Sequence, residues 1–266
     1  MFGSYFGTRD IVELMVDHPI AKLSYSELER KIIKKYGHII FRLFGYPLGV
    51  SSRQRAKVII EYLNPQYNET VLDVGCGIGY YSFELANKFG CKVSGIDMDV
   101  DDIQLAKKIK NITQCSNVYF NVENALNLEF PDNTFEKIML NEVLEHIHDD
   151  KKALAEMHRV LKPNGYIVIS TPHAENIEEY YEQKIKKSHR KDIHIKGGHV
   201  RNGYSLQQIS EILDYACFDV VEYCYISKKF TINVGFPLFL LAYPISMLDM
   251  FYNKTGKGII LKAKKR

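Results

Sequence analysis

Short apolar runs alternate with helical segments from residue 70 onward, and this alternation restricts the fold more than any other feature. Strand-like runs bounded by Gly, Asn or Pro lie at residues 71–74, 93–96, 118–121, 137–140 and 166–170. Helical periodicity marks residues 81–89, 100–110, 143–161 and 206–215. Strands that take turns with helices predict a parallel sheet covered by helices on both faces.

Two further strand-like runs, at residues 219–225 and 258–264, predict an antiparallel pair at the end of the sheet. The expected fold class is therefore α/β: a doubly wound, mostly parallel sheet of seven strands with an antiparallel terminal pair. The apolar segment 226–257 that separates the last two runs is far longer than an ordinary hairpin loop, so we interpret it as a functional insertion. A second, charged insertion occupies residues 176–198.

Residues 1–67 do not show this alternation of strand-like and helical segments. Their pattern predicts a helical cap in front of a main domain at residues 68–266. Helices are expected at residues 27–44, with Ser26 as the N-cap, and at residues 53–63. The hydrophobic fraction of 46% is that of a folded globular protein. Five scattered cysteines without a C-x-x-C pair argue against a disulfide framework or a cysteine zinc site.

The charge balance and the lack of a targeting segment bear on location. With 35 Lys and Arg against 32 Asp and Glu, a formal net charge of +3 disfavours a dedicated nucleic-acid binder. The first residues do not have the pattern of a signal peptide. The most apolar stretch, residues 236–250, is shorter than the roughly 20 residues of a spanning helix. We expect a cytoplasmic protein, with peripheral membrane contact and the oligomeric state left open.

Three glycines follow the first strand of the main domain and precede a helix. Gly75, Gly77 and Gly79 form a G-x-G-x-G turn directly after Asp73 and Val74, and such a turn lets a ligand lie against the backbone. Asp97 ends the next strand, where a carboxylate can accept hydrogen bonds from both ribose hydroxyls of a nucleoside cofactor. The spacing differs from the G-x-G-x-x-G of dinucleotide-binding enzymes.

This turn resembles the first motif of the class I S-adenosylmethionine-dependent methyltransferases, and Asp97 matches their ribose-binding acid. The similarity continues through Asn124-Ala125, residues 140–146 and residues 161–165, and it covers about residues 55–225. It implies a Rossmann-like methyltransferase fold, S-adenosylmethionine as the cofactor, and methyl transfer to an acceptor. The cofactor-binding residues that it implies are Asp73, Gly75, Gly77, Gly79, Asp97, Met98, Asn124, Ala125 and Asn141.

A cluster of possible metal ligands follows the fourth strand. Glu142, Glu145 and His146 are spaced by three and four residues, so the predicted helix 143–161 would place them on one face. The E-x-x-E-H string resembles that of the ubiquinone-pathway O-methyltransferases and the small-RNA 2′-O-methyltransferases, in which a later histidine completes the metal site. His199 matches that histidine, with His194 as the alternative, and Mg²⁺ or Mn²⁺ suits these ligands. The competing interpretation is a site without metal in which Glu142 caps the helix.

Two histidines are candidate general bases. His173 comes just after the fifth strand, where side chains face the methyl group, and His146 belongs to the E-x-x-E-H string. A neutral imidazole accepts a proton readily. The alternative for His173 is a packing role in its loop.

Three hypotheses for the acceptor stay open at this stage. The first is O-methyl transfer to a hydroxyl of a small molecule, a glycan or a lipid-linked acceptor, with a metal that chelates two neighbouring hydroxyls. The second is N-methyl transfer to an amine head group, and the third is a cofactor-binding partner protein without catalysis. We expect the apolar insertion 226–257 to cap the substrate and the basic run 184–191 to hold a phosphate. Nucleic acid is the disfavoured substrate.

Overall fold

The computed structural model describes residues 8–19, 27–44, 50–174, 199–226 and 258–266. The basic run 184–191, His194 and nearly all of the apolar insertion 226–257 therefore lie outside the described residues, and the roles predicted for them stay predictions. Within the described ranges, every helix is too short or too polar to cross a membrane.

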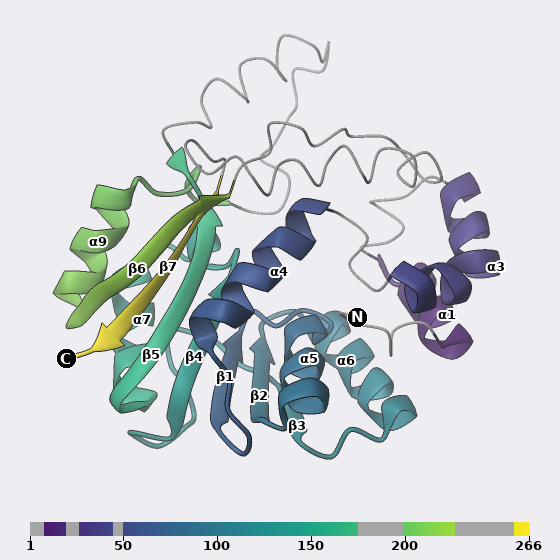
Figure 1. The fold of residues 1–266 in the computed structure, drawn as a ribbon, viewed down its shortest axis with the longest axis horizontal. Helices are drawn as coiled ribbons and strands as arrows, with labels where there is room; N and C mark the ends of the chain where they lie inside the picture. Colours follow the sequence, from purple (N-terminus) through teal and green to yellow (C-terminus); the bar gives the residue numbers. More distant parts are fainter. Residues whose placement is uncertain (1–7, 20–26, 45–49, 175–198, 227–257) are drawn as a thin grey trace, which may run out of the picture.

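A seven-stranded sheet in the order β3-β2-β1-β4-β5-β7-β6 forms the centre of the fold (Figure 1). β1 to β5 are parallel, and β7 runs antiparallel to both β5 and β6, which confirms the predicted fold class. The strands are β1 (Thr70–Val74), β2 (Lys92–Asp97), β3 (Val118–Val122), β4 (Phe135–Asn141), β5 (Leu161–Pro172), β6 (Phe218–Ile226) and β7 (Gly258–Lys265).

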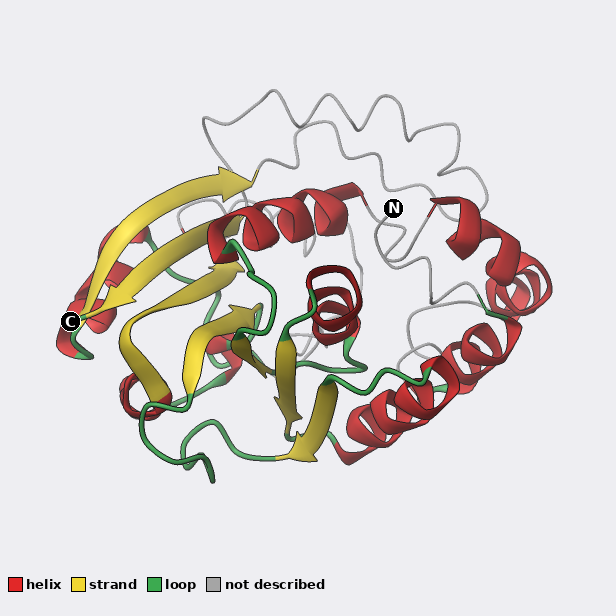
Figure 2. Cartoon of the chain, turned by 60° about the horizontal axis from the view of Figure 1, so that its bottom comes forward, coloured by secondary structure: helices red, strands yellow, loops and turns green. Residues whose placement is uncertain are grey.

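Helices cover both faces of this sheet (Figure 2). Each face has its own core of buried apolar side chains. One core contains α4 (Val50–Leu63), α5 (Tyr80–Phe89) and α6 (Val100–Thr113), and the other contains α7 (Asp150–Val160) and α9 (Leu206–Tyr215). Successive strand residues point to opposite faces, so Val71 joins the first core and Leu72 the second. Strands buried on both sides explain why these runs are continuously apolar.

The predicted helix at residues 143–161 is wrong in its first third. The structure has a short 3-10 turn, η2 (Leu144–His146), and α7 begins only after Asp149, whose carboxylate accepts a hydrogen bond from Lys152 N at 3.0 Å. This N-cap starts a new helix and separates it from η2. The expected shared helical face of Glu142, Glu145 and His146 therefore does not form.

In the N-terminal part, the described residues form three helices. α1 (Arg9–Asp17), which the sequence pattern did not predict, packs against α3 (Glu27–Phe44) through Val12, Val16 and Ile33. α1 also contacts α6, and α4 lies against β5, β6 and β7 (Figure 1). The sheet edge at β3 is less covered than its centre, because residues 123–134, which join β3 to β4, contain no helix.

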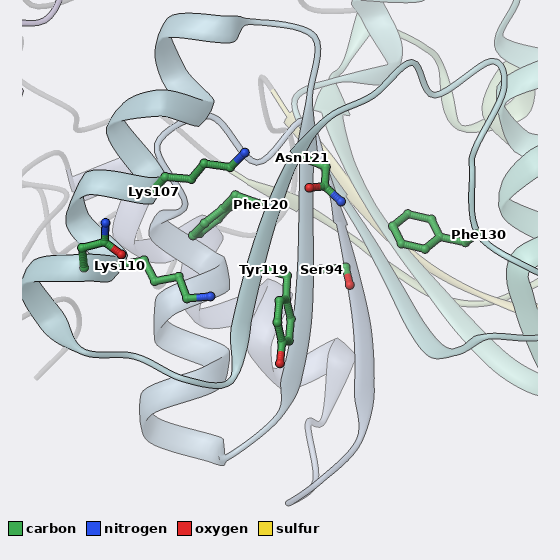
Figure 3. A pocket seen from close by; sticks show the side chains of 8 residues that line it. Ser94, Lys107, Lys110, Tyr119, Phe120, Asn121 and Phe130 are labelled. Atoms are coloured by element: carbon green, nitrogen blue, oxygen red, sulfur yellow. The ribbon is translucent and has the colours of Figure 1, made fainter.

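A cavity of about 530 Å³ lies at this edge, between α6 and Phe130 (Figure 3). Lys107 and Lys110 reach it from α6, and Tyr119 and Asn121 reach it from β3. Among the described residues, the lining includes none of the predicted site residues. The candidate site therefore has to be sought at the carboxyl ends of the strands instead.

Candidate cofactor and acceptor site

The glycine turn after β1 is held against β2 and leaves space above Gly77. The backbone N–H groups of Gly75 and Cys76 both donate to the Ile96 carbonyl, at 2.8 and 3.0 Å. Gly75 has a φ of +67°, and a Cβ there would lie 2.3 Å from Val143 Cγ2, so packing requires this glycine. Gly77 has a φ of +50°, and a Cβ there would come no closer than 3.6 Å to Asp102 Oδ2. Gly77 is thus the glycine that a ligand can approach.

Asp97 is fixed beside this turn by two backbone hydrogen bonds. Its Oδ2 accepts from Gly77 N at 2.8 Å, and its Oδ1 accepts from Asp99 N at 2.9 Å. Each bond uses one lone pair on a different oxygen, so both oxygens of the carboxylate have further acceptor capacity. The position fits a group that also accepts hydrogen bonds from ribose hydroxyls.

Asp73 lies buried beneath the turn, with only 2% of its surface exposed. Desolvation raises the pKa of its carboxyl to about 7, and the charge of Asp97 adds to this effect. The hydroxyl of Ser82 donates to Asp73 Oδ2 at 2.6 Å and lowers the pKa in part. A cationic ligand group near this buried acid would favour its ionised form.

The other predicted cofactor residues lie at or just after the carboxyl ends of β2, β3 and β4. Asn124 Oδ1 accepts from Leu126 N at 2.9 Å, so a backbone N–H already uses one acceptor site of this predicted cofactor residue. Ala125 is buried, whereas Met98 is 68% exposed. Asn141 Oδ1 accepts from the Ser170 hydroxyl at 2.8 Å, which ties the ends of β4 and β5 together.

Glu142 is separated from the other predicted metal ligands. Its φ of +58° is rare for a residue with a side chain, and its N–H donates to the Ser170 carbonyl at 2.9 Å. Its carboxylate lies 3.1 Å from the guanidinium of Arg55 on α4. Of the four predicted ligands, Glu142 is the one that pairs with an arginine in this structure, and its role as a ligand stays a prediction.

The three that converge are Glu145, His146 and His199, whose ligand atoms all lie within 4.8 Å of one another. Glu145 is fully buried, and its Oε2 accepts from the Thr171 hydroxyl at 3.2 Å. Among the residues that the structure describes, its Oε1 has no hydrogen-bond partner. Desolvation, followed by the nearby charge of Glu142, raises the pKa of Glu145 to about 7. The cluster can therefore bind a cation or exchange a proton.

The two imidazoles of this cluster pack edge to face. The ring centroids of His146 and His199 are 4.3 Å apart, with an angle of 77° between the ring planes. Burial lowers the pKa of His199, and the neighbouring His146 lowers it further. The second predicted base, His173, lies outside this cluster: it is 3% exposed and its ring packs on Tyr225 at 4.8 Å.

Sequence reasoning missed two arginines at this site. Arg55 belongs to no motif, and it reaches Glu142 only because α4 lies across the sheet. Arg201 follows His199 by two positions and bonds the loop after η2 through the carbonyls of Ile147 and His148, at 2.9 and 3.0 Å. The sequence could have pointed to Arg201, because an arginine two positions after the predicted ligand His199 is a candidate to hold that segment in place.

Comparison with known proteins gives one family match and several relatives. A family model described as a methyltransferase domain matches residues 65–220. Phosphoethanolamine N-methyltransferase 1 of Arabidopsis thaliana is 34% identical over 151 residues, which are 54% of this chain and 30% of that protein. Norajmaline N-methyltransferase of Rauvolfia serpentina is 32% identical over 127 residues, 45% of this chain and 44% of that protein. The chain thus spans less than half the length of either relative.

Solved structures share the fold at lower identity. A SAM-dependent methyltransferase from Aquifex aeolicus has a TM-score of 0.55 and 21% identity, with 82% of this chain and 91% of that chain covered. Phosphoethanolamine N-methyltransferase 2 of Haemonchus contortus, solved in complex with S-adenosyl-L-methionine, also has a TM-score of 0.55 and 21% identity, with 79% and 52% covered. Both likenesses concern the arrangement of the sheet and its helices.

Proposed function

We propose, from the premise that this chain belongs to the methyltransferase-domain family of S-adenosylmethionine-dependent enzymes, that it methylates the nitrogen of a small amine. The predicted reaction class, methyl transfer from S-adenosylmethionine, is that of the family. For the acceptor, the expected hydroxyl gives way to the amine alternative, because both curated relatives described above are N-methyltransferases.

The observation that carries this proposal is the buried Glu145 beside His146 and His199. The Glu145 oxygen without a partner among the described residues can accept a hydrogen bond from an amine or ammonium group. This cluster lies close to the cofactor turn, since Val143, just before η2, packs against Gly75. An amine held there would lie next to the glycine turn.

Attack by nitrogen requires a lone pair, so a protonated amine must first lose a proton. We assign the uptake of this proton to the imidazole of His146, against which the ring of His199 packs. Glu145 favours the cationic amine on binding and the methylated ammonium afterwards, through its negative charge. In this proposal, Glu145 binds the acceptor and His146 removes its proton.

The cofactor side fits the same arrangement. The open space above Gly77, the Asp97 carboxylate and the buried Asp73 suit the backbone, ribose and ammonium groups of S-adenosylmethionine. When bound, this cofactor supplies a methyl group that is already electrophilic, so the protein mainly aligns donor and acceptor.

A pair of acceptors that differ in one atom tests the proposal. Methyl transfer from radiolabelled S-adenosylmethionine to phosphoethanolamine is compared with transfer to 2-hydroxyethyl phosphate, in which oxygen replaces nitrogen. A small panel of other primary and secondary amines and their hydroxyl analogues extends the comparison. We expect label only in the amines, and a loss of at least about a hundredfold in His146→Asn. Label in the hydroxyl compounds alone would overturn the proposal, and binding without any transfer would favour the partner-protein hypothesis.

The convergence of Glu145, His146 and His199 also favours a second candidate function. One carboxylate and two imidazoles can bind a divalent cation, as predicted for Mg²⁺ or Mn²⁺. Such an ion would lower the pKa of a chelated hydroxyl and favour O-methyl transfer to a small molecule, glycan or lipid-linked diol. Dependence of transfer on the metal separates this candidate from the amine reaction.

A further inference from the structure

Arg201 joins three parts of the acceptor site through its guanidinium. Its Nη2 donates to the carbonyls of Ile147 and His148, at 2.9 and 3.0 Å, in the loop between η2 and α7. Its Nη1 donates to the carboxylate of Asp150 and to the hydroxyl of Tyr204. The side chains of Arg201 and Asp150 are only 26% and 13% exposed, so water screens this pair weakly.

Tyr204 extends the same network to the end of β5. Its hydroxyl donates to Asp150 Oδ2 at 2.8 Å, while its backbone N–H donates to the Pro172 carbonyl at 3.0 Å. Gly203 has a φ of +119°, and a Cβ there would lie 2.1 Å from the Pro172 carbonyl oxygen. The segment from His199 to Tyr204 is thus fastened to the loop after η2 on one side and to β5 on the other.

This fastening determines where His199 stands. Val200 N donates to the Glu145 carbonyl at 3.0 Å, which sets the backbone next to η2. Arg201 comes directly after it and fixes the direction in which the segment continues. The rings of His199 and His146 are in contact. Without these bonds, ordering the segment would cost conformational entropy that this single ring contact does not offset.

We propose that Arg201, together with Asp150 and Tyr204, is a positioning residue that clamps His199 onto His146 and so completes the acceptor site. The clamp acts on the site of the proposed function, but its geometry does not depend on the identity of the acceptor. The planar fork of arginine matches two carbonyls and a carboxylate at once, which the single ammonium of lysine cannot do. Arg201→Lys therefore keeps the charge and removes the clamp.

The first test follows the two rings without any acceptor. In protein with labelled histidines, the nuclear Overhauser effect between the His146 and His199 ring protons is measured for the native chain, Arg201→Lys and Tyr204→Phe. Arg266→Lys is the matched control, because Arg266 also pairs with an aspartate, Asp214 at 2.8 Å, and lies at the far end of β7. We expect the ring contact to disappear in Arg201→Lys, to weaken in Tyr204→Phe and to persist in the control.

The second test asks whether Arg201 acts through His199. With the best amine from the panel, kcat/KM should fall about tenfold to a hundredfold in Arg201→Lys, while the Kd of S-adenosylhomocysteine changes less than about twofold. In a His199→Ala background, Arg201→Lys should add no further loss. A merely structural arginine would give losses that multiply and would weaken the binding of S-adenosylhomocysteine.

Two results would overturn the clamp. One is a ring contact that persists in both Arg201→Lys and Tyr204→Phe, and the other is a loss of kcat/KM that multiplies with that of His199→Ala. If no amine is methylated but the ring contact disappears in the variants, the proposed acceptor is wrong and the clamp stands. Tyr204→Phe removes one hydroxyl, so it keeps the test decisive if Arg201→Lys does not fold.

Discussion

The guanidinium of Arg55 lies 3.1 Å from the carboxylate of Glu142, and this ion pair ties α4 to the loop that follows β4. The two side chains are 15% and 29% exposed, so the pair is largely shielded from water. Glu142 keeps a φ of +58° in this position, a conformation that costs free energy for any residue with a Cβ. The pair thus holds a strained residue directly before the segment that carries Glu145 and His146.

Replacing Glu142 separates the contribution of the ion pair from that of the strain. Glu142→Ala should lower the free energy of unfolding by about 1–3 kcal/mol, because it leaves the shielded guanidinium of Arg55 without its partner. Glu142→Gly loses the same pair but relieves the strain, so it should be about 1 kcal/mol more stable than the alanine variant. Urea unfolding measures both values. An alanine variant as stable as the glycine variant would contradict the strain.

The glycine turn offers a matched pair of substitutions. Gly75→Ala should lower the free energy of unfolding by about 2–5 kcal/mol, because its Cβ would overlap Val143 in a backbone conformation that already disfavours alanine. Gly77→Ala should cost only about 1–2 kcal/mol, since space is open there. The effects on cofactor binding should have the opposite order. If both variants fold, Gly77→Ala should weaken the binding of S-adenosylhomocysteine more than Gly75→Ala does, and calorimetry measures both affinities.

Asp73 should make stability depend on pH. Its pKa of about 7 in the folded protein lies above the ordinary value of 3.8, so its contribution to stability is full below pH 4 and is lost as the pH rises through about 7. Asp73→Asn carries no such charge. Relative to the native chain, the variant should therefore gain about 2–4 kcal/mol of unfolding free energy between pH 4 and pH 8. Urea unfolding across this range measures the gain, and a difference independent of pH would contradict it.

The same acid predicts how cofactor affinity varies with pH. If ionised Asp73 attracts the ammonium group of the cofactor, the Kd of S-adenosylhomocysteine should fall as the pH rises from 6 to 8. The Kd of Asp73→Asn should stay nearly constant over this range. Calorimetric titration of both proteins gives the comparison, and parallel curves would place the ammonium group elsewhere.

The layers of this fold could be predicted from the sequence, because local patterns of apolar residues and glycines indicate where each strand and helix lies. Apolar runs such as 71–74 are buried on both faces, and the glycine turn follows the first of them. Asp97 was predicted to bind the cofactor for the same reason: it ends a strand, and the ends of parallel strands share one edge of the sheet. These inferences need only neighbours along the chain.

The proposed acceptor site was less predictable, because tertiary contacts position its residues. The periodicity of residues 143–161 does not show that Asp149 starts a separate helix. Nor does the sequence indicate that Arg55, distant along the chain, pairs with Glu142, whose role as a metal ligand stays a prediction. His18 also had no predicted partner, yet its ring lies 3.3 Å from Asp102, since α1 docks on α6. No local pattern predicts such contacts.

The last prediction concerns whether methyl transfer needs a bound metal ion and which side chains would bind that ion. Because His146 can take the proton from an amine, we expect excess chelator to leave amine methylation unchanged. Loss of transfer in chelator, restored by Mn²⁺, would instead support O-methyl transfer. In that case Glu145→Gln and His199→Asn should each weaken Mn²⁺ binding at least about tenfold, because their atoms converge within 4.8 Å of each other and of His146. Glu142→Gln should change it less than about twofold, since Arg55 holds that carboxylate outside the cluster. Paramagnetic resonance of bound Mn²⁺ distinguishes the three variants, and equal losses in all of them would support the predicted role of Glu142 as a ligand.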